Sequence, residues 1–247
     1  MTAQTLDLAD RTCIVTGAAQ GIGAAEAVML AGRGATVLCA DRSDTGTVVG
    51  SNPRRRRRRR VLAPRHHGGW RGRAIARHWR TEAELSDRPR RIINTSSESG
   101  LYGNAGQSND AAAKAGLAAL TLTLAAELAR LGVCVNAIAP RARTPMSSHA
   151  FGTLDADALP PSRVAQVVAW LASSTGEGIT GQLLVVAGRD VQRMSTWSAR
   201  TLATQPDAWS AEAAAGFRAA LFPHRDTSHL PAPISDLFTA RPVAASS

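Results

Sequence analysis

The sequence predicts an α/β fold with a doubly wound parallel sheet, in which helices cover both faces of the strands. Two stretches predict it. Near the N-terminus, an apolar run is followed by a glycine-rich turn, a helical stretch and a second apolar run. In the middle of the chain, another apolar run leads through a polar loop into a long Ala- and Leu-rich stretch with helical spacing. A chain of 247 residues can bury the core of one such domain.

The N-terminal stretch predicts strands at 11–16 and 36–40, with a helix at 24–32 between them. The second strand ends at Asp41, roughly 20 residues after the glycine-rich turn. A strand, a turn, a helix and a strand that ends in an acidic residue form the unit that binds dinucleotides in Rossmann-type folds.

The turn of this unit carries Gly17, Gly21 and Gly23, spaced Gly-x-x-x-Gly-x-Gly. The first glycine permits a tight bend, the second lets backbone approach a pyrophosphate, and the third lets the helix pack closely on the strand. The N-terminus of the helix also favours phosphate groups. The alternative is a helix-capping turn that binds no ligand. Two further cofactor-binding residues are expected in the turn, Gln20 and Ile22.

The carboxylate of Asp41 can accept hydrogen bonds from the ribose hydroxyls of an adenosine, and it would repel a 2′-phosphate. We therefore expect NAD rather than NADP. Arg42 follows directly and could meet a phosphate, which weakens this preference.

The middle stretch places polar side chains where a buried strand ends and where a helix begins. Ser96 and Ser97 follow the apolar run, and the helical stretch covers 111–128. Asp110 and Lys114 lie four residues apart at its start. Four residues on a helix bring two side chains to one face, so both can look back toward the serines.

A strand that ends in Ser-Ser, followed thirteen residues later by a helix with Tyr-x-x-x-Lys, resembles the active site of the short-chain dehydrogenase/reductase family. The glycine spacing of the first unit resembles the same family. The resemblance implies that Ser97 holds the substrate oxygen, and that Lys114 binds the nicotinamide ribose and lowers the pKa of a catalytic tyrosine. Asp110 occupies the position of that tyrosine.

The resemblance covers about residues 8–42 and 90–195. Within the family, the sequence is most similar in character to actinobacterial members related to the hydroxyacyl-CoA dehydrogenase part of multifunctional β-oxidation enzymes. It implies one NAD-binding domain at 1–195 and a homodimer or homotetramer. Residues 196–247 are expected to form an extension with one helix, at 208–222, and a disordered end.

Aspartate at position 110 is expected to impair catalysis. Reduction of a ketone produces an alkoxide that needs a proton, and a carboxylate cannot donate one. Like charge about 4 Å from the alkoxide costs roughly 4 kcal/mol at an effective dielectric of 20, or about a thousandfold in rate. Loss of the general acid costs about another 10²–10⁴. We expect Asp110 to form an ion pair with Lys114 instead, as the remnant of an altered catalytic pair. The alternative is an ordinary salt bridge on the helix surface that is unrelated to catalysis.

Further site residues follow from the resemblance. Pro140 and Thr144 match the family's proline and the threonine that meets the nicotinamide carboxamide, but Arg141 replaces the usual glycine. Tyr102 is the sole tyrosine, and we expect it to line the substrate pocket rather than to replace the proton donor. Residues 147–161 correspond to the substrate loop.

The segment at 45–70 has no apolar periodicity and contains seven consecutive arginines, from Arg54 to Arg60. In the family this interval carries the third and fourth strands and an Asn-Asn-Ala-Gly turn, none of which is present. The sheet is therefore predicted to be incomplete. A catalytically dead NAD-binding pseudoenzyme, or the product of a damaged reading frame, is the alternative to an impaired oxidoreductase acting on a secondary alcohol or ketone.

The charge pattern gives little support for other functions. The formal net charge is +10, and removing the arginine run leaves about +3. The run could bind nucleic acid nonspecifically, but no recognition motif accompanies it. No long apolar span or signal peptide is evident, and Cys13, Cys39 and Cys134 are expected in the core. We therefore expect a cytoplasmic protein without disulfides or a metal site.

Overall fold

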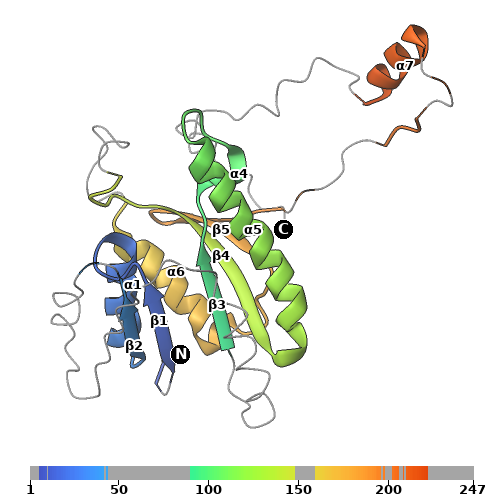
Figure 1. The fold of residues 1–247 in the computed structure, drawn as a ribbon. Helices are drawn as coiled ribbons and strands as arrows, with labels where there is room; N and C mark the ends of the chain where they lie inside the picture. The colour runs from blue at the N-terminus through green and yellow to red at the C-terminus, as the bar shows by residue number, and fades with distance from the viewer. Residues whose placement is uncertain are drawn as a thin grey trace.

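The computed structural model describes residues 6–9, 11–41, 43, 90–147, 159–195, 197, 202–205, 208 and 210–221. They form an α/β fold with parallel strands, as predicted (Figure 1). The predictions about Arg42, the arginine run and most of the substrate loop concern residues outside these ranges.

The N-terminal unit folds as its pattern predicts. β1 (Thr12–Thr16) pairs in parallel with β2 (Thr36–Ala40), and α1 (Gly21–Gly32) connects them. The helix begins three residues before the predicted start at residue 24. Glycine disfavours helix interiors, but the first turn tolerates it because its N–H groups need no intrahelical partner.

Within the described ranges, the second unit carries the remaining strands and four further helices. β3 (Arg90–Thr95) leads through α4 (Glu98–Tyr102) into α5 (Ser108–Leu128), and β4 (Val133–Arg141) follows. The described residues after β4 add α6 (Pro161–Ala172), β5 (Leu183–Ala187), β6 (Asp190–Arg193) and α7 (Ala211–Leu221). Short 3₁₀ turns lie at Ala129–Leu131 and Ser174–Gly176. β3, β4 and β5 are parallel, and β6 adds an antiparallel edge.

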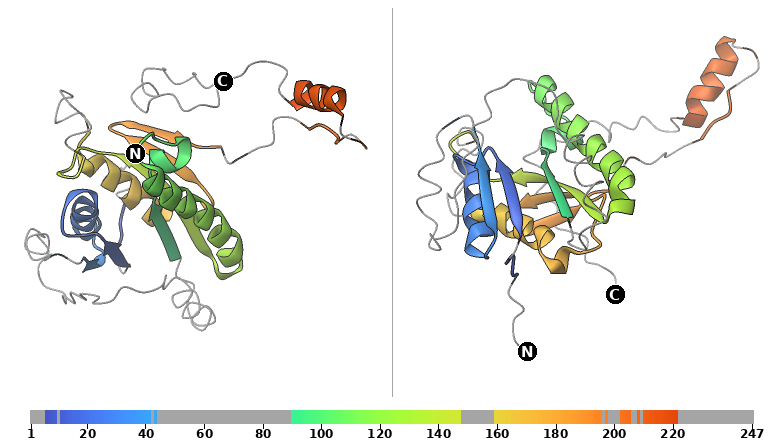
Figure 2. Two further views of the ribbon diagram at one scale, coloured as in Figure 1. Left: turned by 45° about the horizontal axis from the view of Figure 1, so that its top comes forward. Right: turned by 60° about the horizontal axis from the view of Figure 1, so that its bottom comes forward.

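The alternation of side chains along β4 places helices on both faces of this sheet. Val133 and Val135 pack in a cluster with Leu128 of α5. Ile138 faces the other way and packs in a cluster with Val168 of α6. Successive strand residues point to opposite faces, so α5 and α6 lie on opposite sides, as Figure 2 shows. This is the doubly wound arrangement.

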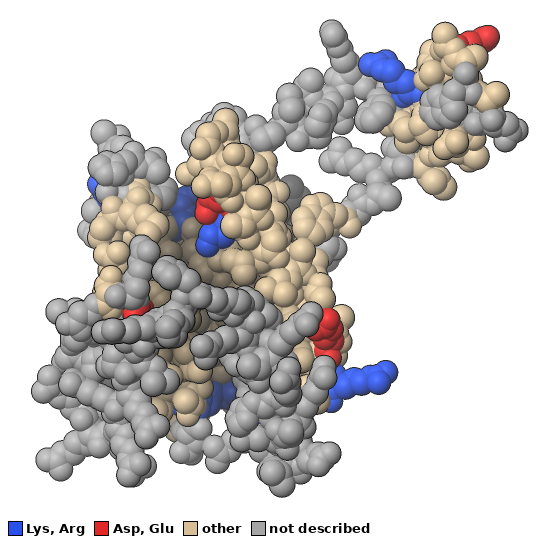
Figure 3. Space-filling view, viewed as in Figure 1, with Lys and Arg blue, Asp and Glu red and all other residues tan. Residues whose placement is uncertain are grey.

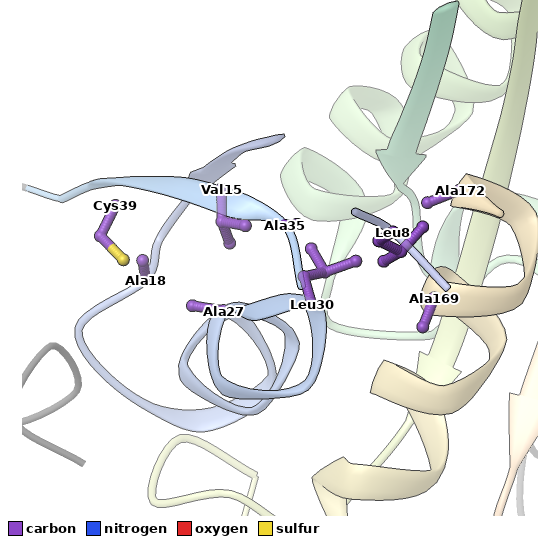
Figure 4. Close-up of a cluster of buried hydrophobic side chains, with 9 residues drawn as sticks. All are labelled: Leu8, Val15, Ala18, Ala27, Leu30, Ala35, Cys39, Ala169 and Ala172. Atoms are coloured by element: carbon purple, nitrogen blue, oxygen red, sulfur yellow. The ribbon is translucent and has the colours of Figure 1, made fainter. Parts of the chain in front are cut away.

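α6 also joins the two units. Its Ala169 and Ala172 pack in one buried cluster with Leu30 of α1 and with Leu8, which precedes β1 (Figure 4). Leu8 is fully buried. The α1–α6 contact therefore holds the N-terminal unit beside the larger sheet.

Among the described strands, β1 and β2 form one sheet, and β3 to β6 form another. Ile14 on β1 is 61% exposed, so the face of β1 opposite α1 is largely uncovered. The predicted incompleteness of the sheet concerns residues between the two described units and stays a prediction.

α5 with its following turn, Ser108–Leu131, is apolar and long enough to cross a bilayer by composition alone. Leu124 and Leu128 pack against β4, however, so the buried side of this helix covers the sheet. α7 falls within the helix predicted at 208–222 and lies apart from the other elements (Figure 1).

Candidate functional site

The turn after β1 has the geometry that its glycines predict. Gly17 has φ +69° and Gly21 has φ +59°, in the left-handed region that favours glycine. A Cβ on Gly23 would lie 2.3 Å from the carbonyl oxygen of Gly17, so a side chain there would disrupt the turn. Gln20 caps α1 without a side-chain hydrogen bond, and no acidic residue lies in the first helical turn. This end of α1 therefore suits an anionic ligand.

Asp41 lies against the same turn. Its Oδ2 accepts a hydrogen bond from the backbone N–H of Ala19 at 2.9 Å, and its Oδ1 accepts one from Ser43 at 2.9 Å. The carboxylate is thereby fixed at the end of β2, beside the turn. The side chain of Ile22 packs against the core cluster that contains Ile138 of β4 and Val168 of α6.

The loop after β4 meets the glycine turn. A Cβ on Gly21 would lie 3.3 Å from Cγ2 of Thr144. The Oγ1 of Thr144 lies 3.0 Å from the Oγ of Ser147, which also accepts the backbone N–H of Thr144 at 2.9 Å. Pro140 lies within β4, opposite Val186 of β5. β4 is parallel to β3, so the two strands end on the same side of their sheet. The approach of Thr144 to Gly21 places the loop after β4 beside the glycine turn.

Ser97 caps α4 and begins a chain of hydroxyl contacts. Its Oγ accepts the backbone N–H of Ser99 at 3.2 Å and lies 2.9 Å from the Oγ of Ser99. The Oγ of Ser99 lies 2.5 Å from Oδ2 of Asp110. Ser99 is 2% exposed, whereas Ser97 and Asp110 are half-buried. A buried hydroxyl therefore connects the serine position of the family to the residue at the tyrosine position.

Lys114 does not pair with Asp110, so that prediction was wrong. The Nζ of Lys114 donates to the carbonyl oxygen of Thr95 at 3.1 Å. Ser96 is buried and donates to the backbone carbonyl of Lys114 at 2.9 Å. The spacing of four residues permits a pair, but the hydroxyl of Ser99 and the end of β3 offer each side chain another partner. Lys114 is consequently held at the carboxyl end of β3.

A buried ion pair lies directly behind the serines. The guanidinium of Arg141 donates from Nε to Glu98 at 2.9 Å and from a terminal nitrogen at 3.1 Å. The side chains are 12% and 7% exposed. Arg141 therefore has a structural partner at the position where the family pattern has glycine, and the pair ties α4 to the end of β4.

Tyr102 ends α4 and its hydroxyl donates to Sδ of Met194 at 3.1 Å. Burial, and next the nearby carboxylate of Glu98, raise the pKa of Tyr102, whereas Arg141 opposes this shift. A hydroxyl that holds its proton more tightly and points at Met194 is poorly suited to replace the missing donor. The expectation that Tyr102 lines the substrate pocket stays a prediction.

Figure 3 shows acidic and basic side chains side by side at a hollow beside α5, within a mostly uncharged surface.

Sequence reasoning missed Ser99 and the contact between Glu98 and Arg141. Glu98 directly follows Ser97, and Arg141 directly follows Pro140. This adjacency to two family positions was the sequence signal that could have indicated their contact.

The fold places this chain in the class of α/β proteins with a dinucleotide-binding type of unit, and comparison with known proteins gives its family. A family model described as enoyl-(acyl carrier protein) reductase matches residues 73–188. The chain is 34% identical over 261 residues to hydroxyacyl-CoA dehydrogenase ChsB1 of Mycobacterium tuberculosis, covering 78% of this chain and 82% of the relative.

Two further relatives agree. A 3-oxoacyl-[acyl-carrier-protein] reductase, FabG of Vibrio cholerae, is 31% identical over 241 residues. The match covers 74% of this chain and 98% of the length of FabG. A crystal structure of a short chain dehydrogenase from Mycobacterium avium matches with a TM-score of 0.74 at 28% identity, covering 92% and 98% of the two chains. The chain belongs to the short-chain dehydrogenase/reductase family, whose members bind nicotinamide cofactors.

Proposed function

We propose that this protein is an NAD(H)-dependent oxidoreductase that interconverts a secondary alcohol and a ketone, with impaired catalysis. The contact between Gly21 and Thr144 is the observation that carries the proposal. It joins the glycine turn to the loop after β4, whose neighbour β3 ends beside Ser97 and beside the ammonium of Lys114 on α5. One bound dinucleotide could therefore extend from the turn to the serines.

The residues around the turn fit this cofactor. The glycine backbone and the N-terminus of α1 would hold the pyrophosphate, and Asp41 would accept from the adenosine ribose. Lys114 and Thr144 would hold the nicotinamide end. When bound, the cofactor supplies or accepts the hydride. We propose NAD rather than NADP because the carboxylate of Asp41 would repel a 2′-phosphate.

The substrate class follows from the relatives. Two relatives that cover about three quarters of this chain are a hydroxyacyl-CoA dehydrogenase and a 3-oxoacyl-[acyl-carrier-protein] reductase. We therefore propose a 3-hydroxyacyl or 3-oxoacyl thioester, whose reacting oxygen would lie against Ser97. Steroid-like alcohols are a second substrate class to test.

Asp110 slows ketone reduction more than it slows alcohol oxidation. Ketone reduction needs a proton donor beside the new alkoxide, and a carboxylate both lacks the proton and repels the charge. Ketone reduction by the wild-type protein should therefore be slow. Asp110→Tyr should raise its kcat by about 10²-fold or more.

The test combines binding and turnover. NADH binding is measured by fluorescence, and turnover is measured with acetoacetyl-CoA for the wild type and Asp110→Tyr. Binding with increased turnover of the variant supports the proposal. Binding without turnover in either protein would favour the alternative, a pseudoenzyme whose Ser97 is engaged by Ser99. Absence of NAD(H) binding would contradict both and favour a damaged reading frame.

We also propose a cytoplasmic homodimer or homotetramer, in which residues 1–195 form the NAD-binding domain and 196–247 an extension. The exposed side of α5 supports association, since it presents small residues that permit close helix contact: Ala112, Gly116, Ala119 and Thr123. Light scattering coupled to gel filtration measures the mass of the assembly. A monomer at micromolar concentration would contradict this part.

A further inference from the structure

We propose that Ser147 is a positioning residue that fixes the hydroxyl of Thr144 as a hydrogen-bond acceptor, so that the cofactor site selects the amide NH₂ group of nicotinamide. This inference rests on the proposed function, in which Thr144 holds the nicotinamide end of the cofactor. Ser147 acts through Thr144, because the protein itself uses every hydrogen-bonding position of the Ser147 hydroxyl.

The proton of Ser147 is committed to a backbone carbonyl. Its Oγ donates to the oxygen of Ala142 at 2.7 Å, and a longer contact of 3.4 Å reaches the oxygen of Thr144. Ala142 is 5% exposed, and within the described residues its carbonyl oxygen has no other donor. A carbonyl oxygen can only accept, and a buried one needs a donor. The single proton of Ser147 is therefore not available to the hydroxyl of Thr144.

Thr144 must then supply the proton for the contact between the two hydroxyls. Their oxygens lie 3.0 Å apart, which is a hydrogen-bond distance. The Oγ of Ser147 already accepts the backbone N–H of Thr144 at 2.9 Å, which leaves it one acceptor position. The proton of Thr144 Oγ1 fills that position. Oγ1 keeps both of its lone pairs, and no hydrogen bond among the described residues uses them.

The methyl group of Thr144 fixes the side chain in the same orientation. Its Cγ2 lies against Gly21, where a Cβ would come within 3.3 Å. A turn about the Cα–Cβ bond of Thr144 would take the methyl group away from Gly21 and break the contact with Ser147. The protein therefore sets both the rotamer and the proton of this hydroxyl before a cofactor binds.

This orientation decides which group on the pyridine ring of the cofactor fits. The carboxamide of nicotinamide has an NH₂ group that donates and a carbonyl oxygen that accepts. A hydroxyl that only accepts takes the NH₂ group. The 3-acetylpyridine analogue of NAD⁺ keeps the carbonyl but has a methyl group in place of NH₂, so it offers no proton to Oγ1. The wild-type site should therefore prefer NAD⁺ to this analogue.

The preference gives Ser147→Ala a specific effect. In the wild type, the Kd for the 3-acetylpyridine analogue should exceed the Kd for NAD⁺ about five- to tenfold, the worth of one hydrogen bond. In Ser147→Ala the hydroxyl of Thr144 can turn its proton to the acetyl oxygen, so the ratio of the two Kd values should fall to about two or less. A purely structural role of Ser147 would weaken both cofactors by the same factor and leave the ratio unchanged.

The experiment measures both Kd values by calorimetry in wild type, Ser147→Ala, Ser147→Thr and Thr144→Val, with thermal melting as a check on folding. Ser147→Thr keeps the hydroxyl and should keep the wild-type ratio. Thr144→Val keeps the methyl group beside Gly21 but removes the hydroxyl. It should weaken NAD⁺ about five- to tenfold and change the Kd of the analogue less than about twofold, and it serves if Ser147→Ala does not fold.

Ser162→Ala is the matched control, because Ser162 is exposed on α6, and it should change neither Kd. Absence of NAD⁺ binding by the wild type would overturn the proposed function and this inference with it. NAD⁺ binding without a preference over the analogue in the wild type would overturn the inference alone. So would a Ser147→Ala variant that keeps the wild-type ratio, or a Ser147→Thr variant that loses it.

Discussion

The ion pair between Glu98 and Arg141 gives the most direct prediction about stability. Arg141→Met keeps the length of the stem but removes the guanidinium, which donates two bonds of 2.9 Å and 3.1 Å. The carboxylate of Glu98, 7% exposed, would then remain buried without this partner. Breaking one side of a buried pair costs about 3–5 kcal/mol.

That loss is large against the whole stability of a domain, about 5–15 kcal/mol. Glu98→Leu removes the other partner and should cost a similar amount. The double variant replaces both charges by apolar groups and should cost much less than the sum of the single variants, because no buried carboxylate is left. The coupling free energy between the two positions should exceed about 2 kcal/mol.

Urea unfolding followed by circular dichroism measures these values. Glu127→Gln, at an exposed position on α5, is a matched control and should change the free energy of unfolding by less than about 0.5 kcal/mol. Additive effects of Arg141→Met and Glu98→Leu would refute the reasoning, because they would mean that the two side chains stabilise the fold independently.

Three further predictions concern the cofactor turn, the α1 helix and the core. Gly23→Ala should weaken NADH binding at least about tenfold by fluorescence titration, because its Cβ would lie 2.3 Å from the oxygen of Gly17; unchanged affinity would contradict the assigned turn. Burial raises the pKa of Glu26 from 4.5 to about 7, so the folded chain binds this proton more tightly than the unfolded chain does. This contribution to stability is complete below about pH 4.5 and is lost as the pH rises toward 7, and a series of urea melts should show that Glu26→Gln removes this slope. Leu128→Ala, at a side chain 1% exposed, should lower the free energy of unfolding by about 2–5 kcal/mol, whereas a loss below 1 kcal/mol would argue against the α5–β4 core.

Local sequence patterns predicted the elements whose conformation is determined by a short stretch of the chain. The turn with Gly17 and Gly23 follows from backbone conformation, and α5 follows from its composition and spacing. α4 was missed because it has only five residues, contains a glycine and follows a serine, a pattern that is equally typical of a loop. β6 was missed because its strand exists only through antiparallel pairing with β5.

The site divides in the same way. The positions of Ser97, Asp110 and Lys114 could be named from their spacing, but their partners could not. Whether Asp110 binds Lys114 or Ser99 depends on the path of the loop between β3 and α5. The contact between Glu98 and Arg141 joins residues 43 apart in the chain, which no local pattern reports.

The central claim is that the glycine turn and Lys114 hold one and the same nicotinamide cofactor. Lys114 is the sole lysine of the chain, so protein labelled with ¹³C-lysine gives a single lysine side-chain signal by NMR. Titration with NAD⁺ should shift this signal saturably, and Gly23→Ala should raise the NAD⁺ concentration at half-saturation at least about tenfold. A Lys114 signal that stays unchanged while NAD⁺ binds would contradict the claim.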